Sequence, residues 1–112
     1  EARGHANYKE KIVEIDEDGT TICRGHSGKP NRMIRNEFTD YWAEREDEIR
    51  PYPRQMVEIG DPASVRGRIE GDVVGGVLPA GQGAGMIQSV KAAADVVEDV
   101  MEQARAVFDA WL

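Results

Sequence analysis

The sequence predicts a mixed α/β chain that is mostly helical, with one or two short strands and a long amphipathic helix at its C-terminal end. Three observations predict this class. Apolar residues recur every three or four positions near both ends of the chain, as they do on one face of a helix. A β-branched run, Thr20 to Ile22, follows an Asp-Gly pair and has the composition of a strand. Half of the 12 glycines lie between Gly71 and Gly85, which indicates a connection before the last helix.

Length and composition indicate one folded unit over residues 1–112, without a second domain. With 40% hydrophobic and 31% charged residues, the chain is apolar enough to fold, yet too short for two substantial cores. The net charge of −7, from 14 basic and 21 acidic side chains, repels phosphate backbones and anionic lipid surfaces. We therefore expect no nucleic-acid partner and no membrane partner.

Cys23 is the single cysteine, which excludes an internal disulfide and a zinc site built from cysteines. A reducing, cytoplasmic location fits this composition. No stretch approaches the roughly 20 apolar residues that a membrane span needs, and the first residues do not resemble a secretory signal. Because the chain does not begin with methionine, we expect it to start within a longer polypeptide.

The N-terminal part is predicted to form a short helix followed by a strand. Apolar residues recur at helical spacing from Asn7 to Ile15, with charged residues between them. An Asp-Gly turn and the strand Thr20 to Cys23 follow. A competing interpretation pairs Lys11 to Ile15 with Thr20 to Arg24 in a hairpin around the same turn.

The middle of the chain is predicted as a loop and two helical segments. Gly25 to Asn31 is rich in turn residues, and we expect it to cross the surface as a loop. Thr39 is a plausible N-cap for a helix over Asp40 to Ile49, which two prolines then close. A further helical turn or two is expected from Arg54 to Ile59, ending at Gly60 to Pro62.

The C-terminal segment carries the strongest helical pattern. We predict a helix of about 20 residues that begins after Ser89, whose hydroxyl can cap it. Its broad apolar stripe must cover another surface, either in this chain or on something the chain lacks. The stripe contains Val90, Ala93, Ala94, Val97, Val100, Met101, Ala104, Val107, Phe108 and Trp111.

The glycine-rich stretch, GDVVGGVLPAGQGAG, has two interpretations. It is either a tight connector or a backbone wall that lies against a flat ligand, with Gln82 as the one side chain offering both donor and acceptor. A dinucleotide fingerprint starting at Gly81 and Gly83 would need glycine at position 86, which is Met86. No Lys-Ser or Lys-Thr pair follows the glycines, so a Walker A loop is excluded as well.

Other chemistry-bearing residues have ordinary structural explanations. His5 and His26 lie far apart in sequence and are expected at the surface, and Cys23 is expected to be a small buried residue. The carboxylates between Asp40 and Glu48 are expected to be solvated. Three aromatic residues at helical spacing are expected to anchor the core: Tyr41, Trp42 and Trp111. We assign no catalytic residue and no metal site.

Several motifs together resemble the C-terminal part of one enzyme family. Gly71-Asp72, Gly76, Ala80-Gly81-Gln82 and Ala84-Gly85 are similar in type and spacing to the C-terminal signature of the nitronate monooxygenase (2-nitropropane dioxygenase) family. Two upstream stretches extend the resemblance over nearly the whole chain. These are Arg35-Asn36-x-Phe38-Thr39 and His5-Ala6-Asn7-Tyr8-Lys9.

The resemblance implies an FMN-dependent TIM barrel with the flavin at the C-terminal ends of its strands and a smaller segment closing over it. Because such a barrel needs about 250 residues, we expect this chain to be a C-terminal fragment of that fold. It would comprise the last barrel helix, the closing segment and the C-terminal helix. The family's flavin-phosphate turns and its catalytic histidine lie upstream of the matched region.

The resemblance also supplies the candidate site. Ala80, Gly81, Gln82 and Gly83 correspond to the loop near the flavin ring and substrate, while Arg35 and Asn36 are expected to help position the closing segment. The complete enzyme is expected to bind FMN, which this chain alone would not retain.

The implied reaction is oxidation of alkyl nitronates, small-molecule substrates, by oxygen through FMN. The alternatives are an FMN-type enoyl-thioester reductase and a non-catalytic accessory or split-subunit piece that docks through its C-terminal helix. Expected partners are the remainder of the barrel or a partner subunit, with a homo-oligomer left open.

Overall fold

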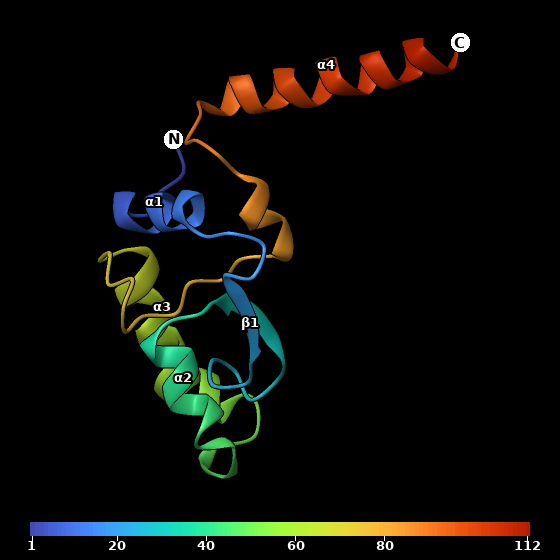
Figure 1. Cartoon of the computed structure of the whole chain (residues 1–112). Helices are drawn as coiled ribbons and strands as arrows, with labels where there is room; N and C mark the ends of the chain where they lie inside the picture. Colours follow the sequence, from blue (N-terminus) through green and yellow to red (C-terminus); the bar gives the residue numbers. More distant parts are fainter.

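The computed structural model describes all 112 residues, and it consists of a body of short elements and one projecting helix (Figure 1). The molecule measures 55 × 28 × 23 Å along its principal axes. The long dimension arises because the last helix, α4 (Ala93–Trp111), extends away from the body (Figure 1). The class predicted from the sequence, mostly helical with short strands, agrees with these elements.

The first helix, α1 (Ala6–Glu14), confirms the N-terminal helix prediction. His5 precedes it, and the imidazole Nδ1 accepts a hydrogen bond from the Asn7 amide at 3.0 Å. That contact satisfies one of the free donors at the start of the helix. The alternative hairpin is wrong, because Lys11 lies in the helix and the strand beyond the turn pairs elsewhere.

The sheet is a two-stranded antiparallel pair, β1 (Thr20–Cys23) and β2 (Asn31–Ile34). β1 was predicted, whereas β2 was not, and its first residue lies inside the predicted loop. Residues 78–80 run along the other edge of β2, because the Ile34 amide donates to the Leu78 carbonyl at 2.8 Å. The Ala80 amide donates in turn to the Arg32 carbonyl at 3.4 Å. The glycine-rich segment is therefore attached to this sheet.

The helix after the sheet, α2 (Glu37–Ala43), begins earlier than predicted. Asn36 is its N-cap, and Thr39 occupies the third helical position, where its hydroxyl accepts from the Asn36 amide at 3.0 Å. The two residues form a capping box, which satisfies backbone donors reciprocally. The prediction of Thr39 as N-cap is thus wrong, as is the helix to Ile49, since α2 ends at Ala43 and only a 3₁₀ turn, η1 (Glu46–Glu48), follows.

The second helical segment is longer than predicted. A π-helical turn, η2 (Met56–Gly60), confirms the expected turns and continues without a break into α3 (Asp61–Arg68). The predicted stop at Gly60 is wrong, because Gly60 keeps helical backbone angles and lies against His26. A Cβ at Gly60 would collide with the His26 carbonyl, so this glycine permits close packing.

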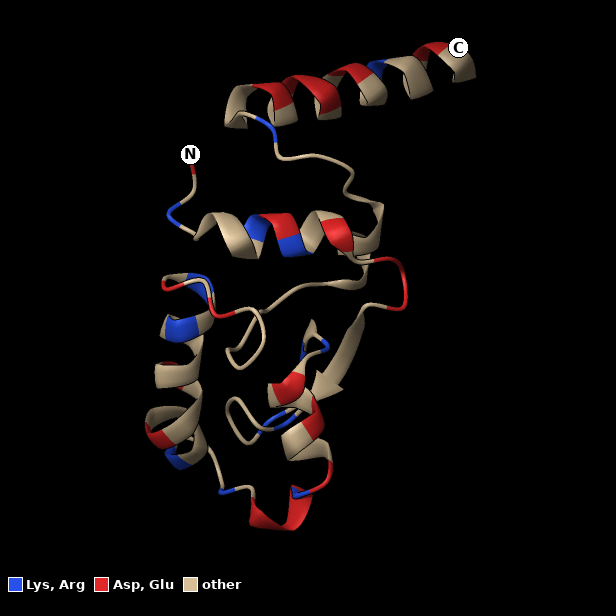
Figure 2. Cartoon of the chain, turned by 60° about the vertical axis from the view of Figure 1, so that its left-hand side comes forward, with Lys and Arg blue, Asp and Glu red and all other residues tan.

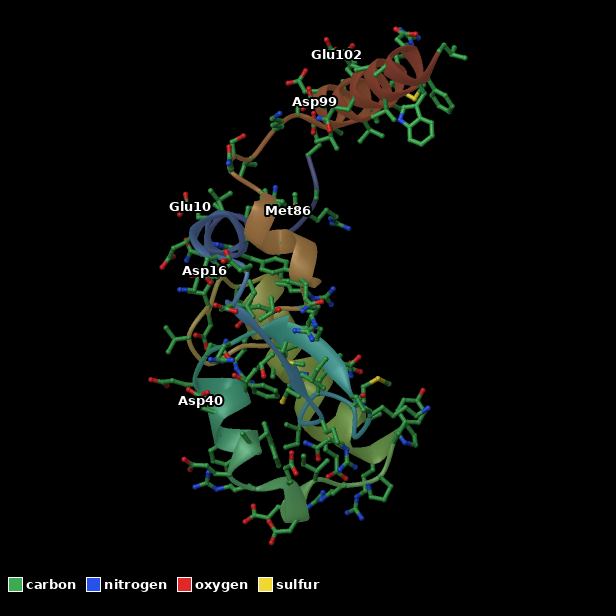
Figure 3. All side chains as sticks on the ribbon, turned by 45° about the vertical axis from the view of Figure 1, so that its right-hand side comes forward. Glu10, Asp16, Asp40, Met86, Asp99 and Glu102 are labelled. Carbon is green, nitrogen blue, oxygen red and sulfur yellow. The ribbon has the colours of Figure 1, made fainter.

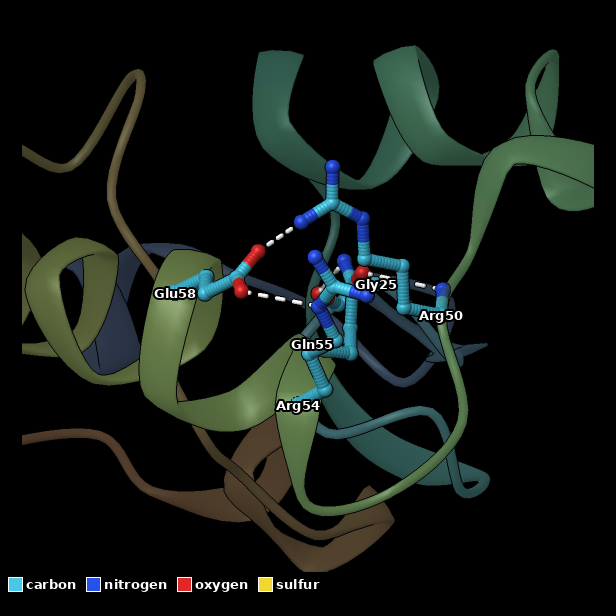
Figure 4. A network of polar contacts seen from close by, with 5 residues as sticks. All are labelled: Gly25, Arg50, Arg54, Gln55 and Glu58. Carbon is cyan, nitrogen blue, oxygen red and sulfur yellow. Dashed lines mark hydrogen bonds and ion pairs between the residues drawn. The ribbon is translucent and has the colours of Figure 1, made fainter.

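The loop from Gly25 to Pro30 is held against the segment before η2 by a buried glutamine. Gln55 is 1% exposed; its Nε2 donates to the Gly25 carbonyl at 2.7 Å, and its Oε1 accepts from the Arg50 amide at 3.2 Å. Arg50 and Arg54 both pair with Glu58 beside it (Figure 4). The expectation that this loop crosses the surface is only partly right, because Gly25 and Ser27 are buried.

The hydrophobic core lies between the sheet, α2 and α3. It contains Cys23, Met33, Phe38, Trp42, Ala63 and Val77. Trp42 is therefore a core anchor, as predicted, and Phe38 packs beside it with ring centroids 6.4 Å apart. The same prediction is wrong for Tyr41, which is 48% exposed, and for Trp111, which is 86% exposed. Cys23 is buried, as predicted.

The C-terminal helix α4 confirms the predicted long amphipathic helix, but its start differs. Ala92 is the N-cap and offers no side-chain bond, so the Ser89 cap is wrong. Instead, the Glu1 carboxylate accepts from the Ala93 amide at 2.7 Å. Figure 3 shows the side chains of α4, Asp99 and Glu102 among them, extending into open space. The apolar face is uncovered within this chain: Val97, Val100, Met101, Val107, Phe108 and Trp111 are all exposed.

No helix combines the length and apolar character that crossing a membrane requires.

Candidate functional site

The first half of the glycine-rich segment is fixed by Asn36. Its side-chain oxygen caps α2, while its Nδ2 donates to the Val73 carbonyl at 3.1 Å and to the Gly76 carbonyl at 2.8 Å. One amide group thus joins the start of α2 to a turn about 40 residues further along the chain. All four possible interactions of an Asn amide, two donated and two accepted, are used here.

The middle of the segment is fixed by Tyr8 from α1. The half-buried phenol donates a hydrogen bond to the Pro79 carbonyl, immediately before Ala80. Burial raises the pKa of Tyr8 above its usual value, and the positive charge of Arg68 opposes that shift in part. The phenol therefore stays protonated and can donate throughout the neutral range.

The end of the segment packs against the turn that follows α1. A Cβ added to Gly85 would lie 2.6 Å from the carbonyl carbon of Asp16 and 2.6 Å from the amide nitrogen of Glu17. Real Cβ atoms do not approach backbone so closely, so Gly85 is required for this contact. The packing connects the short 3₁₀ helix η3 (Gln82–Met86) to the N-terminal part of the chain.

Between these contacts, Gly81 to Gly83 faces solvent. Gly81, Gln82 and Gly83 are exposed, and a Cβ at either glycine would meet no atom within 4 Å. The amides of these three residues donate no hydrogen bond within the chain. Packing within the chain therefore explains Gly85 but leaves Gly81 and Gly83 unexplained.

The other predicted site residues lie apart from this exposed stretch. Asn36 contacts Val73 and Gly76, and no hydrogen bond joins it to residues 80–83. Arg35 is exposed, and its amide donates to the Gly19 carbonyl at 3.0 Å. Its side chain borders a hollow of about 300 Å³ between β1 and α2, where it makes no ion pair.

Burial shifts the pKa values of Cys23 and His26. Burial raises the pKa of Cys23, whose Sγ accepts from the Gly25 amide at 3.3 Å, so the thiol stays protonated. Burial lowers the pKa of His26, although Asp61 nearby opposes that effect. Both histidines are partly buried and have structural contacts, which corrects the expectation of plain surface residues.

Tyr8 is the residue that the sequence pattern did not single out. Its place at helical spacing predicted only an apolar contact, and its ring is indeed half-buried. The hydroxyl contact with Pro79 spans 71 residues, and no local pattern indicates such a partner.

Comparisons with known proteins agree with this arrangement. The family model described as Nitronate monooxygenase matches residues 1–103. A curated protein described as a probable nitronate monooxygenase, from Staphylococcus saprophyticus subsp. saprophyticus, is 30% identical over 102 residues. The matched region is 91% of this chain and 28% of that protein.

The chain is also similar to solved structures. FabK from Thermotoga maritima superposes with a TM-score of 0.80 at 30% identity, covering 96% of this chain and 34% of FabK. A mutant of the same FabK superposes with a TM-score of 0.72 at 24% identity, and the superposition covers 96% of this chain and 31% of the mutant chain. At that lower identity the second likeness shows the fold alone.

These elements are a segment of a TIM-barrel enzyme fold, with two strands rather than a closed barrel. The chain belongs to the nitronate monooxygenase family, which is a family of TIM-barrel flavoenzymes. It spans less than a third of the curated relative and about a third of FabK.

Proposed function

We propose that the complete protein is a flavin-dependent oxidoreductase that binds FMN, and that Ala80 to Gly83 forms one wall of its flavin and substrate site. The observation that carries this proposal is the exposed backbone at Gly81 and Gly83. A planar ring can lie close to such a surface because no Cβ and no neighbouring atom intervenes. The contacts at Pro79 and Gly85 hold this stretch in place on either side.

The residues present fit one part of the cofactor. Free backbone amides at Gly81 to Gly83 can donate to carbonyl oxygens or nitrogens at a ring edge. None of the hollows in the chain is lined by residues 80–83, so this stretch supplies a wall rather than an enclosed pocket. We therefore propose that the remainder of the barrel binds the FMN phosphate. That remainder is also the partner that we propose for this chain.

In the proposed reaction an alkyl nitronate is oxidised by oxygen. Bound FMN would supply the electron transfer between the two, as flavins do. The role of this chain is to orient the substrate, because the exposed Gln82 amide can donate hydrogen bonds to the nitronate oxygens. The family match and the probable nitronate monooxygenase relative support this substrate. We also propose that the complete protein is cytoplasmic.

The proposal is tested in the complete protein with Gly83→Val. Valine would occupy the space that we assign to the ring, so we expect the Kd for FMN, measured by titration and absorbance between about 350 and 500 nm, to rise at least about tenfold, a loss of about 1.4 kcal/mol in binding. Nitronate-dependent oxygen uptake should fall as well. The same substitution in the 112-residue chain should leave its fold intact, because that Cβ meets no neighbour. An unchanged Kd for FMN in the complete variant would contradict the proposal.

Assays with different substrates distinguish the alternative activities. An enoyl-thioester reductase would oxidise NADH in the presence of a short enoyl thioester and would take up little oxygen with nitronates. An accessory piece would show neither reaction in any complete form of the protein. Gln82→Leu in the active protein should raise KM for the nitronate while flavin content stays unchanged, because that side chain orients substrate rather than the ring.

A further inference from the structure

A hollow of about 330 Å³ lies between the start of α1 and the end of α3, outside the glycine-rich stretch. Its floor is apolar and includes Tyr8, Ile12 and Ile69, the last of which is 54% exposed. Three cationic side chains border it: Arg3, Lys9 and Arg68. Figure 2 shows the basic segments before and within α1 above the basic end of α3.

The charge of this hollow is opposite to that of the chain. No acidic residue lines it, although acidic side chains exceed basic ones by 21 to 14 in the whole sequence. None of its three cations takes part in any of the chain's ion pairs. An anion bound there would supply the opposite charge that these three cations lack within the chain.

Two of the cations are already oriented. Lys9 Nζ donates to the Ala2 carbonyl at 2.8 Å, and Arg68 Nε donates to the hydroxyl of the buried Ser64 at 2.9 Å. Each contact uses one donor of its group and leaves the others free, since an ammonium has three and a guanidinium five. These contacts reduce the side-chain entropy that binding would otherwise remove.

We propose that this hollow binds a small amphipathic anion, with a carboxylate or phosphate head at Arg3, Lys9 and Arg68 and a short apolar body over Tyr8, Ile12 and Ile69. Its volume is at the lower end for small-molecule sites, which limits the ligand to a short chain or single ring. Charge-assisted hydrogen bonds hold the head, and apolar burial holds the body. Binding at this hollow needs no flavin, so its test does not depend on the proposed oxidoreductase activity.

The test uses the 112-residue chain, labelled with ¹⁵N and titrated with hexanoate, hexyl phosphate or hexan-1-ol. We expect both anions to shift the amides around Gly4, Lys9 and Ile69, and to bind at least about tenfold more tightly than the alcohol. Hexanoate and hexyl phosphate differ only in the head, so their relative affinity identifies which anion the site prefers.

Matched variants locate the site. Lys9→Gln should raise the Kd of the preferred anion about threefold, as for a partly exposed charge, and Arg3→Gln should act in the same direction. Lys11→Gln on the same helix, whose ammonium pairs with Glu14 at 3.2 Å, should leave the Kd unchanged. Equal affinity for anion and alcohol, equal effects of the two lysine variants, or shifts confined to α4 would overturn the proposal.

Discussion

Gly83 and Gly85 lie two residues apart and have opposite surroundings. Gly85 touches the backbone of Asp16 and Glu17, whereas Gly83 has open space where a side chain would stand. Packing within the chain therefore requires glycine at position 85 but not at position 83. Both have backbone conformations that other residues can adopt, since the positive φ angles belong to Gly28 and Gly71.

We expect Gly85→Ala to lower the free energy of unfolding by about 1–3 kcal/mol, because the turn after α1 must move away. Gly83→Ala should instead be neutral or stabilising by up to about 1 kcal/mol, through a less flexible unfolded chain. Urea unfolding of the two variants gives both values. Similar losses in both would mean that Gly83 is also packed within this chain.

Asn36 combines a helix cap with contacts to a distant turn, and two substitutions separate these roles. Serine caps helices about as well as asparagine but has no amide to donate, so Asn36→Ser should lose about 1–3 kcal/mol for two hydrogen bonds. Asn36→Ala removes the cap as well and should lose about 1 kcal/mol more. Thermal unfolding measures both. An unchanged stability in Asn36→Ser would show that the contacts to Val73 and Gly76 contribute nothing, whereas equal losses in the two variants would show that the cap contributes nothing.

His26 makes stability depend on pH in the acidic range. Burial lowers the pKa of His26 in the folded chain below its usual value of 6.5, so protonation is easier in the unfolded chain. Stability from this group is therefore complete above pH 6.5 and decreases as pH falls below that value. We expect the urea midpoint to drop between pH 7 and pH 5, and to drop less in His26→Gln. An identical drop in the variant would assign the effect to carboxylates.

At the scale of elements, the sequence predicted what local patterns determine. α1, β1 and α4 were predicted because periodicity and β-branched composition act within one segment. β2 was missed because Asn31 to Ile34 follows a proline and lacks strict alternation, and its pairing with β1 and with residues 78–80 creates the strand. The stop expected at Gly60 failed because close packing on His26, rather than a turn, explains that glycine.

The candidate site, too, was predicted only in the part that a local pattern determines. Glycine density and family resemblance selected Ala80 to Gly83, and the structure places Gly81 to Gly83 of that stretch at the surface with free amides. The residues that hold it, Tyr8 and Gly85, act through contacts with distant segments, which spacing cannot reveal. The role of Ala80 to Gly83 toward flavin and substrate stays a prediction.

The helix α4 has few contacts with the body, so we expect it to contribute little to stability. A chain ending at Ala92 should unfold with a free energy within about 0.5 kcal/mol of the full chain, as for changes at exposed positions. Chemical denaturation followed by near-ultraviolet circular dichroism of Trp42 measures this. A loss of several kcal/mol would mean that α4 folds back onto the body in solution.

For the whole molecule, the exposed face of α4 favours association. Apolar faces of this extent mark contact sites, so we expect concentration-dependent oligomers in sedimentation velocity. Val100→Lys should weaken association, whereas Glu102→Gln, which changes net charge by the same amount on the polar face, should not. A monomer at all concentrations would contradict this, and equal effects of both variants would point to charge. The remainder of the barrel is the partner that we propose for this face in the complete protein.

Tyr8 is shared between two surfaces, because its ring lines the hollow beside α3 and its hydroxyl holds Pro79 next to Ala80. An anion that displaces the ring would therefore also shift the backbone at Ala80. Thermodynamic linkage then requires reciprocity: whatever binds at Ala80 to Gly83 must change the affinity of the hollow by the same factor. The Tyr8 phenol would thus couple binding in the hollow to binding at Ala80 to Gly83. Tyr8→Phe would remove this coupling while keeping the aromatic ring in place.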